Sequence, residues 1–367
     1  MKKALTVVGA RPQFIKLSPV ARAFEGRFAH VIVHTGQHYD DAMSRVFFED
    51  LVLPRPDYNL GVGSGTHAMQ TGSMMTELEP LILAEKPDVV VVYGDTKPDV
   101  VVVYGDTNST LAGALVAAKL NIPVAHIEAG LRSFNREMPE EINRIVTDRV
   151  SQFLFCPTET ALQNLSREGM GVSSKLVGDV MLDALLLHEH LIPHHHSVLT
   201  RLNIQPRGYY LATVHRASNT DNAENLRTII DAIDTLDSPV ILPLHPRTRS
   251  FMELHKVHFA ERHNIRFIEP VGYLDMLALQ SHAKKVLTDS GGIQKEAYCL
   301  GTPCVTLRTE TEWTETLEGG WNILAGVDKH AIVDAAGVLP FGKPQRDRYG
   351  KGDASRLIAD VLGENLP

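Results

Sequence analysis

The sequence is poor in cysteine and has no excess of basic residues. It holds three cysteines in 367 residues, and they form no CxxC pair. This sparse, odd set excludes a disulfide framework and predicts a protein of the reducing cytoplasm. The formal net charge is −8, which excludes a broad basic surface for nucleic acid. An anionic ligand would therefore have to meet local Arg and Lys side chains or helix N-termini.

Long hydrophobic runs are also missing. No apolar stretch reaches the roughly 18 residues of a membrane span, so no membrane contact is expected. The N-terminal segment has two lysines and then a short apolar run, without the hydrophobic region and cleavage site of a signal peptide. We interpret this segment as the first β-strand.

Motifs for common cofactors and metals are absent as well. The first strand-to-helix turn lacks the GxGxxG fingerprint, so no nicotinamide cofactor is indicated, and no HExxH string occurs. Five histidines gather around Pro193, and these are His188, His190, His194, His195 and His196. Their spacing and their linker-like surroundings argue against a metal site. We predict that the protein uses no cofactor and no metal.

The sequence does contain a regular alternation of short apolar runs and helix-like segments. The runs are Leu5–Val8, His30–Val33, Val100–Tyr104, Val124–Ile127, Phe153–Phe155, Tyr209–Val214, Val240–Leu244, Ile265–Ile268, Val286–Thr288 and Cys304–Leu307. The segments between them include Leu111–Leu120, Ala223–Thr235 and Ile293–Leu300. This alternation predicts an α/β protein whose parallel sheets are covered on both faces. Two such sets predict two Rossmann-like domains.

We place the boundary between these domains in a linker near residues 168–180. The first domain is predicted to cover residues 1–172, and the second to cover residues 173–351. The stretch Ala354–Leu362 has a helical pattern. We expect a C-terminal helix within 352–367 to cross back and join the first domain.

An exact tandem repeat interrupts the first domain. Residues 86–96 read KPDVVVVYGDT, and residues 97–107 repeat them letter for letter. Solenoid repeats have longer periods, so this is a duplication in which one copy suffices for a strand. The second copy leads directly into a good helix, and we therefore predict Val100–Tyr104 in the sheet. The first copy would then lengthen the connection on the rim away from the strands' carboxyl ends, where ligands bind.

Two strand-to-helix turns are candidate phosphate sites. Gly9–Lys16 follows the first strand, opens a helix with Pro12 and carries Arg11 and Lys16. Thr288–Glu296 has the same plan with Ser290, Gly291 and Gly292, and Glu296 lies one turn into its helix. Small residues and helix N-termini let a diphosphate approach backbone amides. The alternative is an ordinary βα turn with solvated cations at the first site, and a glycine turn with a surface glutamate at the second.

Carboxylates at strand ends are the acid–base candidates. Asp106 and Glu128 each follow a predicted strand, and Glu140 and Glu141 follow Pro139. The carboxyl ends of parallel strands converge on one crevice, so Asp106 and Glu128 should be near neighbours. Like charges held together raise one pKa, which suits proton transfer at neutral pH. The alternative for Asp106 is a simple helix cap.

Two histidines also end strands, in the second half of the chain. His215 is followed by Arg216, and His245 is followed closely by Arg247. Their equivalent positions, each beside a cation, favour contacts to a phosphate or a sugar over a purely structural role.

Together these motifs resemble the non-hydrolysing UDP-N-acetylglucosamine 2-epimerase family. The matching strings are GARPQFIK, HTGQH, VYGDTNSTLAGALVA, HIEAGLRS, PEEINR, TDSGGIQKEA and LGTPCVTLR. The resemblance implies a glycosyltransferase-B-like pair of Rossmann-like domains with the active site in the cleft between them. It also implies a chemistry in which the sugar's C2–H is abstracted, UDP leaves C1, and UDP returns as C2 is reprotonated on the other face.

The resemblance assigns roles to particular residues. It implies that Asp106, Glu128, Glu140 and His215 are catalytic. It implies that Arg11, Ser290, Gly291 and Glu296 contact UDP. We also expect contacts to the UDP-sugar from Lys16, Gln37, His38, Arg132, Arg216, His245 and Gly292. The partner is a UDP-linked N-acetylamino sugar, and the enzyme is expected to be a cytoplasmic homodimer that serves cell-surface polysaccharide synthesis.

Some strings are similar to a sister group of the family. The forms Arg11–Phe14, Gly65–His67 and Thr311–Trp313 resemble enzymes that epimerise UDP-2,3-diacetamido-2,3-dideoxyglucuronic acid, which is the alternative substrate. A hydrolysing epimerase would share the fold, a glycosyltransferase would share the UDP site but use an acceptor, and a nucleotide-sugar sensor would need no aligned carboxylates. Products formed from the UDP-sugar alone distinguish these classes, since only a non-hydrolysing epimerase leaves an intact UDP-linked epimer.

Overall fold

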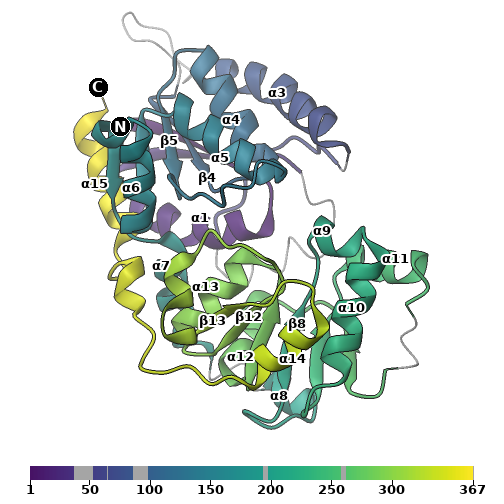
Figure 1. The fold of residues 1–367 in the computed structure, drawn as a ribbon. Coiled ribbons are helices and arrows are strands. Elements are labelled where there is room, and N and C mark those ends of the chain that lie inside the picture. Colours follow the sequence, from purple (N-terminus) through teal and green to yellow (C-terminus); the bar gives the residue numbers. More distant parts are fainter. Residues whose placement is uncertain (37–52, 64, 86–97, 193–196, 258–261, 367) are drawn as a thin grey trace, which may run out of the picture. The chain divides into compact units, whose positions relative to one another are not determined.

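The computed structural model describes residues 1–36, 53–63, 65–85, 98–192, 197–257 and 262–366. The chain divides into two compact units, Met1–Leu187 with Asp347–Pro367, and His188–Arg346. Each unit is a parallel sheet with helices on both faces (Figure 1).

The first unit alternates strands and helices along the chain. Its elements are β1 Lys2–Val8, α1 Arg11–Phe24, β2 Phe28–His34, β3 Tyr58–Asn59, α3 His67–Ala84, β4 Val100–Tyr104, α4 Asn108–Lys119, β5 Val124–Ile127, α5 Pro139–Val150, β6 Phe153–Cys156, α6 Glu159–Arg167, η1 Gly171–Ser173, β7 Ser174–Leu176, α7 Val180–Glu189, η4 Arg346–Tyr349 and α15 Ala354–Asn365. The order in the sheet is β3-β2-β1-β4-β5-β6-β7.

The second unit repeats this plan. Its elements are α8 Ser197–Arg201, β8 Tyr210–Thr213, α9 Ala217–Thr220, α10 Ala223–Asp234, β9 Val240–Pro243, α11 Pro246–Leu254, β10 Ile265–Ile268, α12 Tyr273–His282, β11 Lys285–Thr288, α13 Gly291–Leu300, β12 Cys304–Thr306, η3 Thr314–Gly320, β13 Asn322–Leu324 and α14 Lys329–Gly337. The sheet order, β10-β9-β8-β11-β12-β13, is that of a classical dinucleotide-binding fold counted from β8. The predicted pair of Rossmann-like domains is confirmed.

The strands are apolar on both faces because helices cover both. In the first unit Leu5 and Val7 of β1 and Val101 and Val103 of β4 pack with α3 and α4 in one core. The residues between them on β1 and β4 are also buried and face the opposite layer. Full burial of such side chains contributes about 1.5–3 kcal/mol each, which fixes the strand register.

The second copy of the repeat fills the sheet, as predicted. All of Val100–Tyr104 is buried, and β4 pairs with β1 and β5. The first copy lies outside the described residues. The chain on either side of it converges on Lys3, whose Nζ donates to the Glu85 carbonyl at 2.7 Å and whose N–H donates to Asp99 Oδ2 at 2.5 Å. Lys3 belongs to the amino end of β1, so the connection leaves from the rim opposite the strands' carboxyl ends.

The predicted linker near residues 168–180 is wrong in part, because it contains β7. This strand has only three residues, Ser174–Leu176, and its mixed polarity hides it from pattern analysis. The following helix α7 carries Asp183, which accepts from the N–H groups of Ala354 and Ser355 at 3.2 and 2.7 Å. This contact caps α15 and holds it in the first unit, where α15 packs against α1 (Figure 1).

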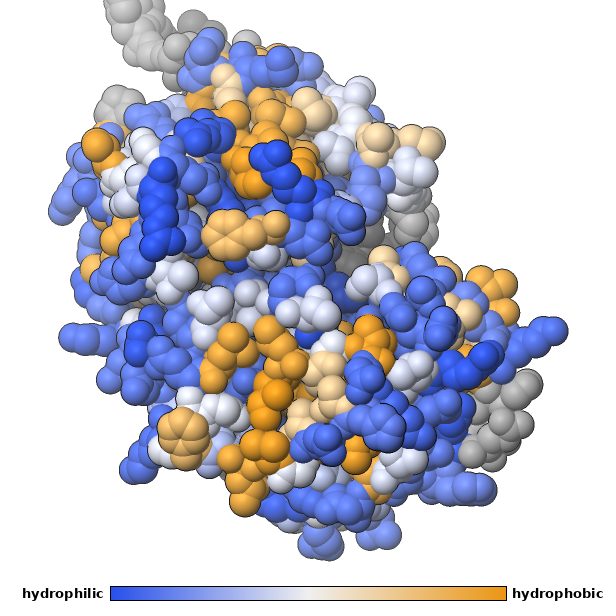
Figure 2. Space-filling view, in the orientation of Figure 1, coloured by the Kyte–Doolittle hydropathy of each residue, from blue (hydrophilic) through white to orange (hydrophobic). Residues whose placement is uncertain are grey.

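The surface of the protein is predominantly polar on the face drawn in Figure 2, with hydrophobic side chains in separate groups. Among the described residues, no helix is both long and apolar enough to span a membrane.

Candidate active site

Each sheet has a switch point where the strand order reverses, and the predicted site residues lie there. In the first unit the reversal falls between β1 and β4, and in the second it falls between β8 and β11. Ligands of open α/β sheets bind outside the carboxyl ends of the strands at such points. Asp106 follows β4, and His215 and Ser290 follow β8 and β11.

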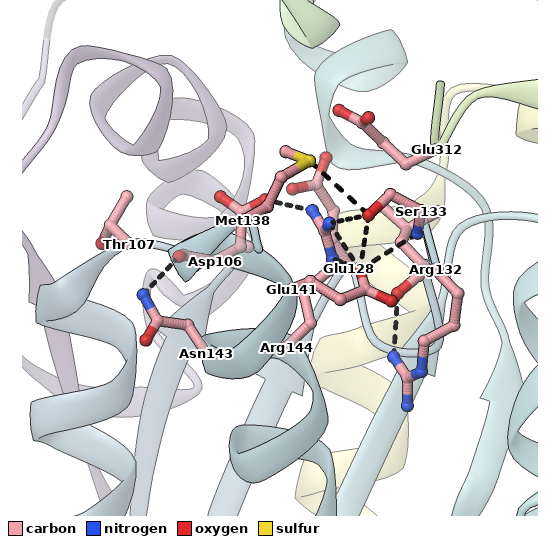
Figure 3. Close-up of polar contacts among 12 residues, drawn as sticks. Asp106, Thr107, Glu128, Arg132, Ser133, Met138, Glu141, Asn143, Arg144 and Glu312 are labelled. Atoms are coloured by element: carbon pink, nitrogen blue, oxygen red, sulfur yellow. Dashed lines mark hydrogen bonds and ion pairs between the residues drawn. The ribbon is translucent and has the colours of Figure 1, made fainter. Parts of the chain in front are cut away.

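Asp106 is held by a buried arginine of α5. Its Oδ2 lies 2.5 Å from Arg144 Nη1, and its carbonyl accepts from Asn143 Nδ2 at 2.9 Å (Figure 3). The Asp106 side chain is 29% exposed whereas that of Arg144 is 2% exposed, so the carboxylate faces solvent from a rigid base. The cap of α4 is Thr107, whose side chain accepts from Thr110 N–H. The alternative role of Asp106 as that cap is therefore wrong.

Glu128 adopts a backbone conformation that is rare outside glycine. Its φ is +70°, and such left-handed residues cost about 1–3 kcal/mol and cluster at functional sites. The side chain is 4% exposed and pairs with Lys16 Nζ. At Gly105, whose φ is +63°, a Cβ would lie 3.0 Å from Glu128 Oε2. The structure thus brings Glu128 to the turn that carries Asp106, as the converging strand ends predict.

The first predicted phosphate site is partly filled by the protein itself. The N–H groups of Gly9 and Ala10 donate to Gln13 Oε1 at 2.7 and 3.0 Å. Gln13 Nε2 donates in turn to the Tyr104 carbonyl at 3.0 Å. Lys16 is paired with Glu128 instead of projecting toward these amides. The turn is therefore braced against β4, and two of its amides are unavailable to an anion.

Three predicted contacts are not described by the structure. The side chain of Arg11 and the residues Gln37 and His38 lie outside the described part of the chain.

Of the two glutamates after Pro139, Glu141 has the structural role. It is 1% exposed and accepts from the N–H groups of Ser133 and Phe134, both at 3.0 Å, and from Arg144 Nη2 at 2.7 Å. Burial would raise the pKa of Glu141, but the Ser133 N–H and the Arg144 guanidinium outweigh burial and lower this pKa. Glu140 precedes it at the start of α5 and is partly exposed.

Arg132 requires a correction. Its guanidinium is 2% exposed and pairs with Asp148 at 2.7 Å and with Glu168 at 2.8 Å. In Figure 3 it is turned away from the cluster around Arg144. The Arg132 side chain packs onto α5 and the end of α6, where Asp148 and Glu168 lie. The structure therefore places Arg132 in an interior ion network and not at the ligand-binding edge.

The second unit gathers the predicted histidines. The rings of His215 and His245 lie with centroids 5.7 Å apart. Asp289, which is fully buried, accepts from the N–H groups of His215 and Arg216 at 3.0 and 2.9 Å, and its Oδ1 lies 3.3 Å from His215 Nδ1. Asp289 thus orients His215. Its position between the end of β11 and Ser290 was the only sequence signal for this role.

In the turn into α13 the space beside Gly291 is occupied by a side chain, whereas the space beside Gly292 is free. A Cβ at Gly291 would lie 2.2 Å from Glu312 Oε1, whereas a Cβ at Gly292 would meet nothing within 4 Å. Ser290 is the N-cap, and its side chain makes no capping hydrogen bond. Glu296 is 5% exposed and accepts from Gln280 Nε2 at 2.8 Å. The free space at Gly292 is the part of this turn that a phosphate could approach.

The histidine-rich stretch shows no metal-binding geometry where it is described. His188 is buried with its ring edge-on to Tyr273, and His194–His196 lie outside the described residues. The part of the chain that the structure describes holds no cluster of three metal-ligating side chains.

Comparison with known proteins identifies a family model and several relatives that match this sequence. Residues 22–97 and 96–363 match the family model of UDP-N-acetylglucosamine 2-epimerase, and the two matched segments meet where the tandem copies join. A homologue of that enzyme from Methanococcus maripaludis is 50% identical over 364 residues, which are 98% of this chain and 99% of the relative. The UDP-2,3-diacetamido-2,3-dideoxy-D-glucuronate 2-epimerase of Pseudomonas aeruginosa is 47% identical, over 99% of both chains.

A solved structure is similar along the whole chain. The crystal structure of the UDP-GlcNAc 2-epimerase of Methanocaldococcus jannaschii, in complex with UDP-GlcNAc and UDP, has a TM-score of 0.91 and 44% identity, and the match covers 100% of both chains. This likeness confirms the glycosyltransferase-B-like fold class. The site, the fold and these matches show that the chain belongs to the UDP-N-acetylglucosamine 2-epimerase family of UDP-sugar isomerases.

Proposed function

We propose that this enzyme interconverts UDP-N-acetylglucosamine and UDP-N-acetylmannosamine without hydrolysing the link to UDP. The observation that carries the proposal is the pair of strand-end carboxylates, Asp106 and Glu128, each held by a cation beside the same left-handed turn. Inversion at C2 needs a proton removed from one face and a proton delivered to the other. Two or more positioned carboxylates meet this requirement.

The reaction proceeds by elimination and re-addition. A carboxylate takes the C2 proton, the electron pair of the C2–H bond forms the C1–C2 double bond, and UDP leaves C1 with the pair of the C1–O bond. UDP then adds back to C1 of the 2-acetamidoglucal, and an acid protonates C2 on the opposite face. Asp106, Glu128 and Glu140 are the proposed proton-transfer groups. No oxidant or metal is needed in this balance.

The UDP moiety is assigned to the second unit. The proposed contacts are Arg216, His245, Ser290, Gly291, Gly292 and Glu296, with Arg11 from the first unit. His215 is the proposed catalytic histidine. Support comes from the open space at Gly292 at the N-terminus of α13, where helix dipole and amides favour an anion. The proposal requires both sets of residues to act on one substrate molecule.

The cellular setting is part of the proposal. Cys156, Cys299 and Cys304 are all free and buried, which fits a reducing cytoplasm. There the enzyme would act as a homodimer and supply an epimerised UDP-sugar for cell-surface polysaccharide.

Incubation of the purified enzyme with UDP-N-acetylglucosamine alone tests the reaction. The expected product is the intact UDP-linked manno epimer, at equilibrium with the starting sugar. Free N-acetylmannosamine with UDP would indicate a hydrolysing enzyme, and an unchanged substrate would contradict the proposal for this sugar.

A second candidate substrate is UDP-2,3-diacetamido-2,3-dideoxyglucuronic acid. It is favoured by the 47% identity to the Pseudomonas aeruginosa enzyme named for it. The two sugars differ in the acetamido group at C3 and the carboxylate at C6. Parallel assays with both sugars decide between them, and the larger kcat/KM identifies the substrate.

A further inference from the structure

A buried histidine lies between the ends of the two strands that carry the proposed catalytic carboxylates. His126 belongs to β5 and is fully buried. Its Nδ1 lies 2.7 Å from Asp148 Oδ1, and its Nε2 lies 2.7 Å from the carbonyl oxygen of Gly105. One ring therefore connects α5, β5 and the turn after β4.

Both ring nitrogens face groups that accept hydrogen bonds. The carbonyl oxygen of Gly105 cannot donate, so Nε2 must carry a proton. Asp148 accepts from the N–H of Gly130 at 3.2 Å and pairs with Arg132 at 2.7 Å, which a carboxylate does when it is ionised. Nδ1 must then donate to Asp148, and the ring carries two protons and a positive charge.

The charges around this ring balance. Arg132 brings a second cation, and Glu168 brings a second carboxylate at 2.8 and 2.9 Å from Arg132 Nε and Nη2. Burial alone would raise the pKa of Asp148, but the charges of His126 and Arg132 outweigh it and lower this pKa. Buried charges persist when they are paired and hydrogen-bonded. Two cations and two anions meet that condition here.

The cationic ring acts on the geometry of the active site. Gly105 has a φ of +63° and directly precedes Asp106. Glu128 stands two residues after His126, also with a left-handed backbone, and its Oε2 is close to Gly105. A charge-assisted hydrogen bond to the Gly105 carbonyl is about twice as strong as a neutral one. It ties the end of β4 to the end of β5, which sets the positions of Asp106 and Glu128 relative to each other.

We propose that His126 is a doubly protonated positioning residue that holds the Gly105–Asp106 turn beside Glu128. This proposal depends on the proposed function only for the identity of the reaction that Asp106 and Glu128 carry out. The ring is fully buried and does not exchange protons with the substrate. Arg132 and Glu168 close the network that keeps the ring charged, which is the role that the structure gives Arg132 in place of a substrate contact.

Nitrogen NMR of the protein with ¹⁵N-labelled histidine tests the protonation state without substrate. At neutral pH His126 is expected to show two protonated ring nitrogens, because each nitrogen faces a hydrogen-bond acceptor. A ring with one unprotonated nitrogen would overturn the proposal. Resonance assignment of the wild type identifies the ring even if a variant fails to fold.

The variant His126→Gln tests the positioning role. A glutamine has one amide nitrogen and cannot reproduce both donor positions of the ring. We expect kcat to fall about 10- to 100-fold while KM and the affinity for UDP, measured by calorimetry, stay unchanged. The matched control is His30→Gln on β2, whose ring contacts Thr6 at 2.8 Å and whose loss should leave kcat unchanged.

The NMR measurement and the His126→Gln kinetics can each contradict the role of His126 whether or not the proposed reaction is correct. If the enzyme prefers another UDP-sugar, the NMR result is unaffected and kcat is compared on that sugar. An unchanged kcat in folded His126→Gln would overturn the positioning role, and so would a parallel loss of UDP affinity, which indicates general structural damage.

Discussion

Two of the three proposed catalytic carboxylates, Asp106 and Glu128, are each held by a buried cation. Arg144 is 2% exposed and contacts both Asp106 and Glu141, so Glu141 fixes the arginine and the arginine fixes Asp106. Lys16 is similarly buried against Glu128. Since the partners are held by interior contacts, the carboxylates need little reorganisation when substrate binds.

Loss of either carboxylate should stop turnover but spare the nucleotide site. We expect Asp106→Asn and Glu128→Gln to lower kcat by about 10²- to 10⁴-fold, with UDP affinity by calorimetry unchanged. The control is Glu137→Gln, at an exposed position before α5, which should behave as wild type. Wild-type turnover in Asp106→Asn would remove this residue from the mechanism.

Glu141 should make stability depend on acid pH. Its folded pKa is lowered, so its contribution to the free energy of unfolding is fully present above the unfolded value of about 4.3. The contribution is lost as pH falls from there through the folded pKa, because the unfolded state then binds more protons. Denaturant titrations between neutral and acid pH should show a steeper loss in the wild type than in Glu141→Gln. If the free energy of unfolding falls equally with pH in both proteins, Glu141 does not contribute to the loss of stability in acid.

At the scale of elements, tight turns bring the strand ends together. β1 passes into α1 through Gly9, where a Cβ would lie 2.1 Å from Thr35 Oγ1 and 2.2 Å from Ser109 Oγ. Both hydroxyl side chains are fully buried and hydrogen-bonded to each other at 2.9 Å. A Cβ at position 9 would force both buried hydroxyls to move and would disturb their hydrogen bond, so this turn favours glycine.

The substitution Gly9→Ala should therefore destabilise the first unit. Overpacking of this kind costs about 1–3 kcal/mol, and the melting temperature should fall. The control Gly72→Ala lies in α3, where a Cβ meets nothing within 4 Å, and alanine there favours the helix. Its melting temperature should stay the same or rise. Equal changes in melting temperature for both substitutions would show that the neighbouring side chains move away from the new Cβ at position 9 at little cost.

Elements with a strong apolar pattern could be predicted from the sequence, whereas short ones could not. The predicted runs Val100–Tyr104, Val124–Ile127 and Ile265–Ile268 coincide with β4, β5 and β10. The edge strands β3 and β7 have two and three residues, and their sequences lack a continuous apolar run. The side chains of β3 and β7 are mostly exposed, so their composition carries little apolar signal.

The site could be predicted as far as its strand ends, but its side-chain partners could not. Asp106, Glu128, His215 and Ser290 follow strands, and parallel topology alone gathers such residues. The contact of Arg144 with Asp106 joins residues 38 positions apart. Nothing in a single sequence indicates such pairings, so neither the interior partners of Arg132 nor the contact of Asp289 with His215 can be predicted from it.

At the scale of the whole molecule, the tandem duplication adds a second copy of a core strand without displacing the site. The described second copy occupies β4, and Glu85 and Asp99 both contact Lys3. The chain ends that flank the first copy are therefore held together at the rim opposite the proposed chemistry.

Removal of one copy should leave a working enzyme. Deletion of residues 86–96 retains one strand sequence for the β4 position and shortens only the connection at that rim. We expect unchanged kcat and an equal or higher melting temperature. In the full chain, Asp95→Asn should be active and Asp106→Asn inactive. The reverse result would mean that the first copy occupies the site.

Elimination and re-addition require proton exchange at C2, and turnover in D₂O measures this exchange directly. The enzyme is incubated with the UDP-sugar that it accepts, and the epimerised product is analysed by proton NMR. Elimination and re-addition predict a product whose C2 carries deuterium, because the carboxylate that protonates C2 exchanges with solvent. Full retention of the original C2 proton in the epimerised product would contradict the elimination mechanism and the roles given to Asp106 and Glu128.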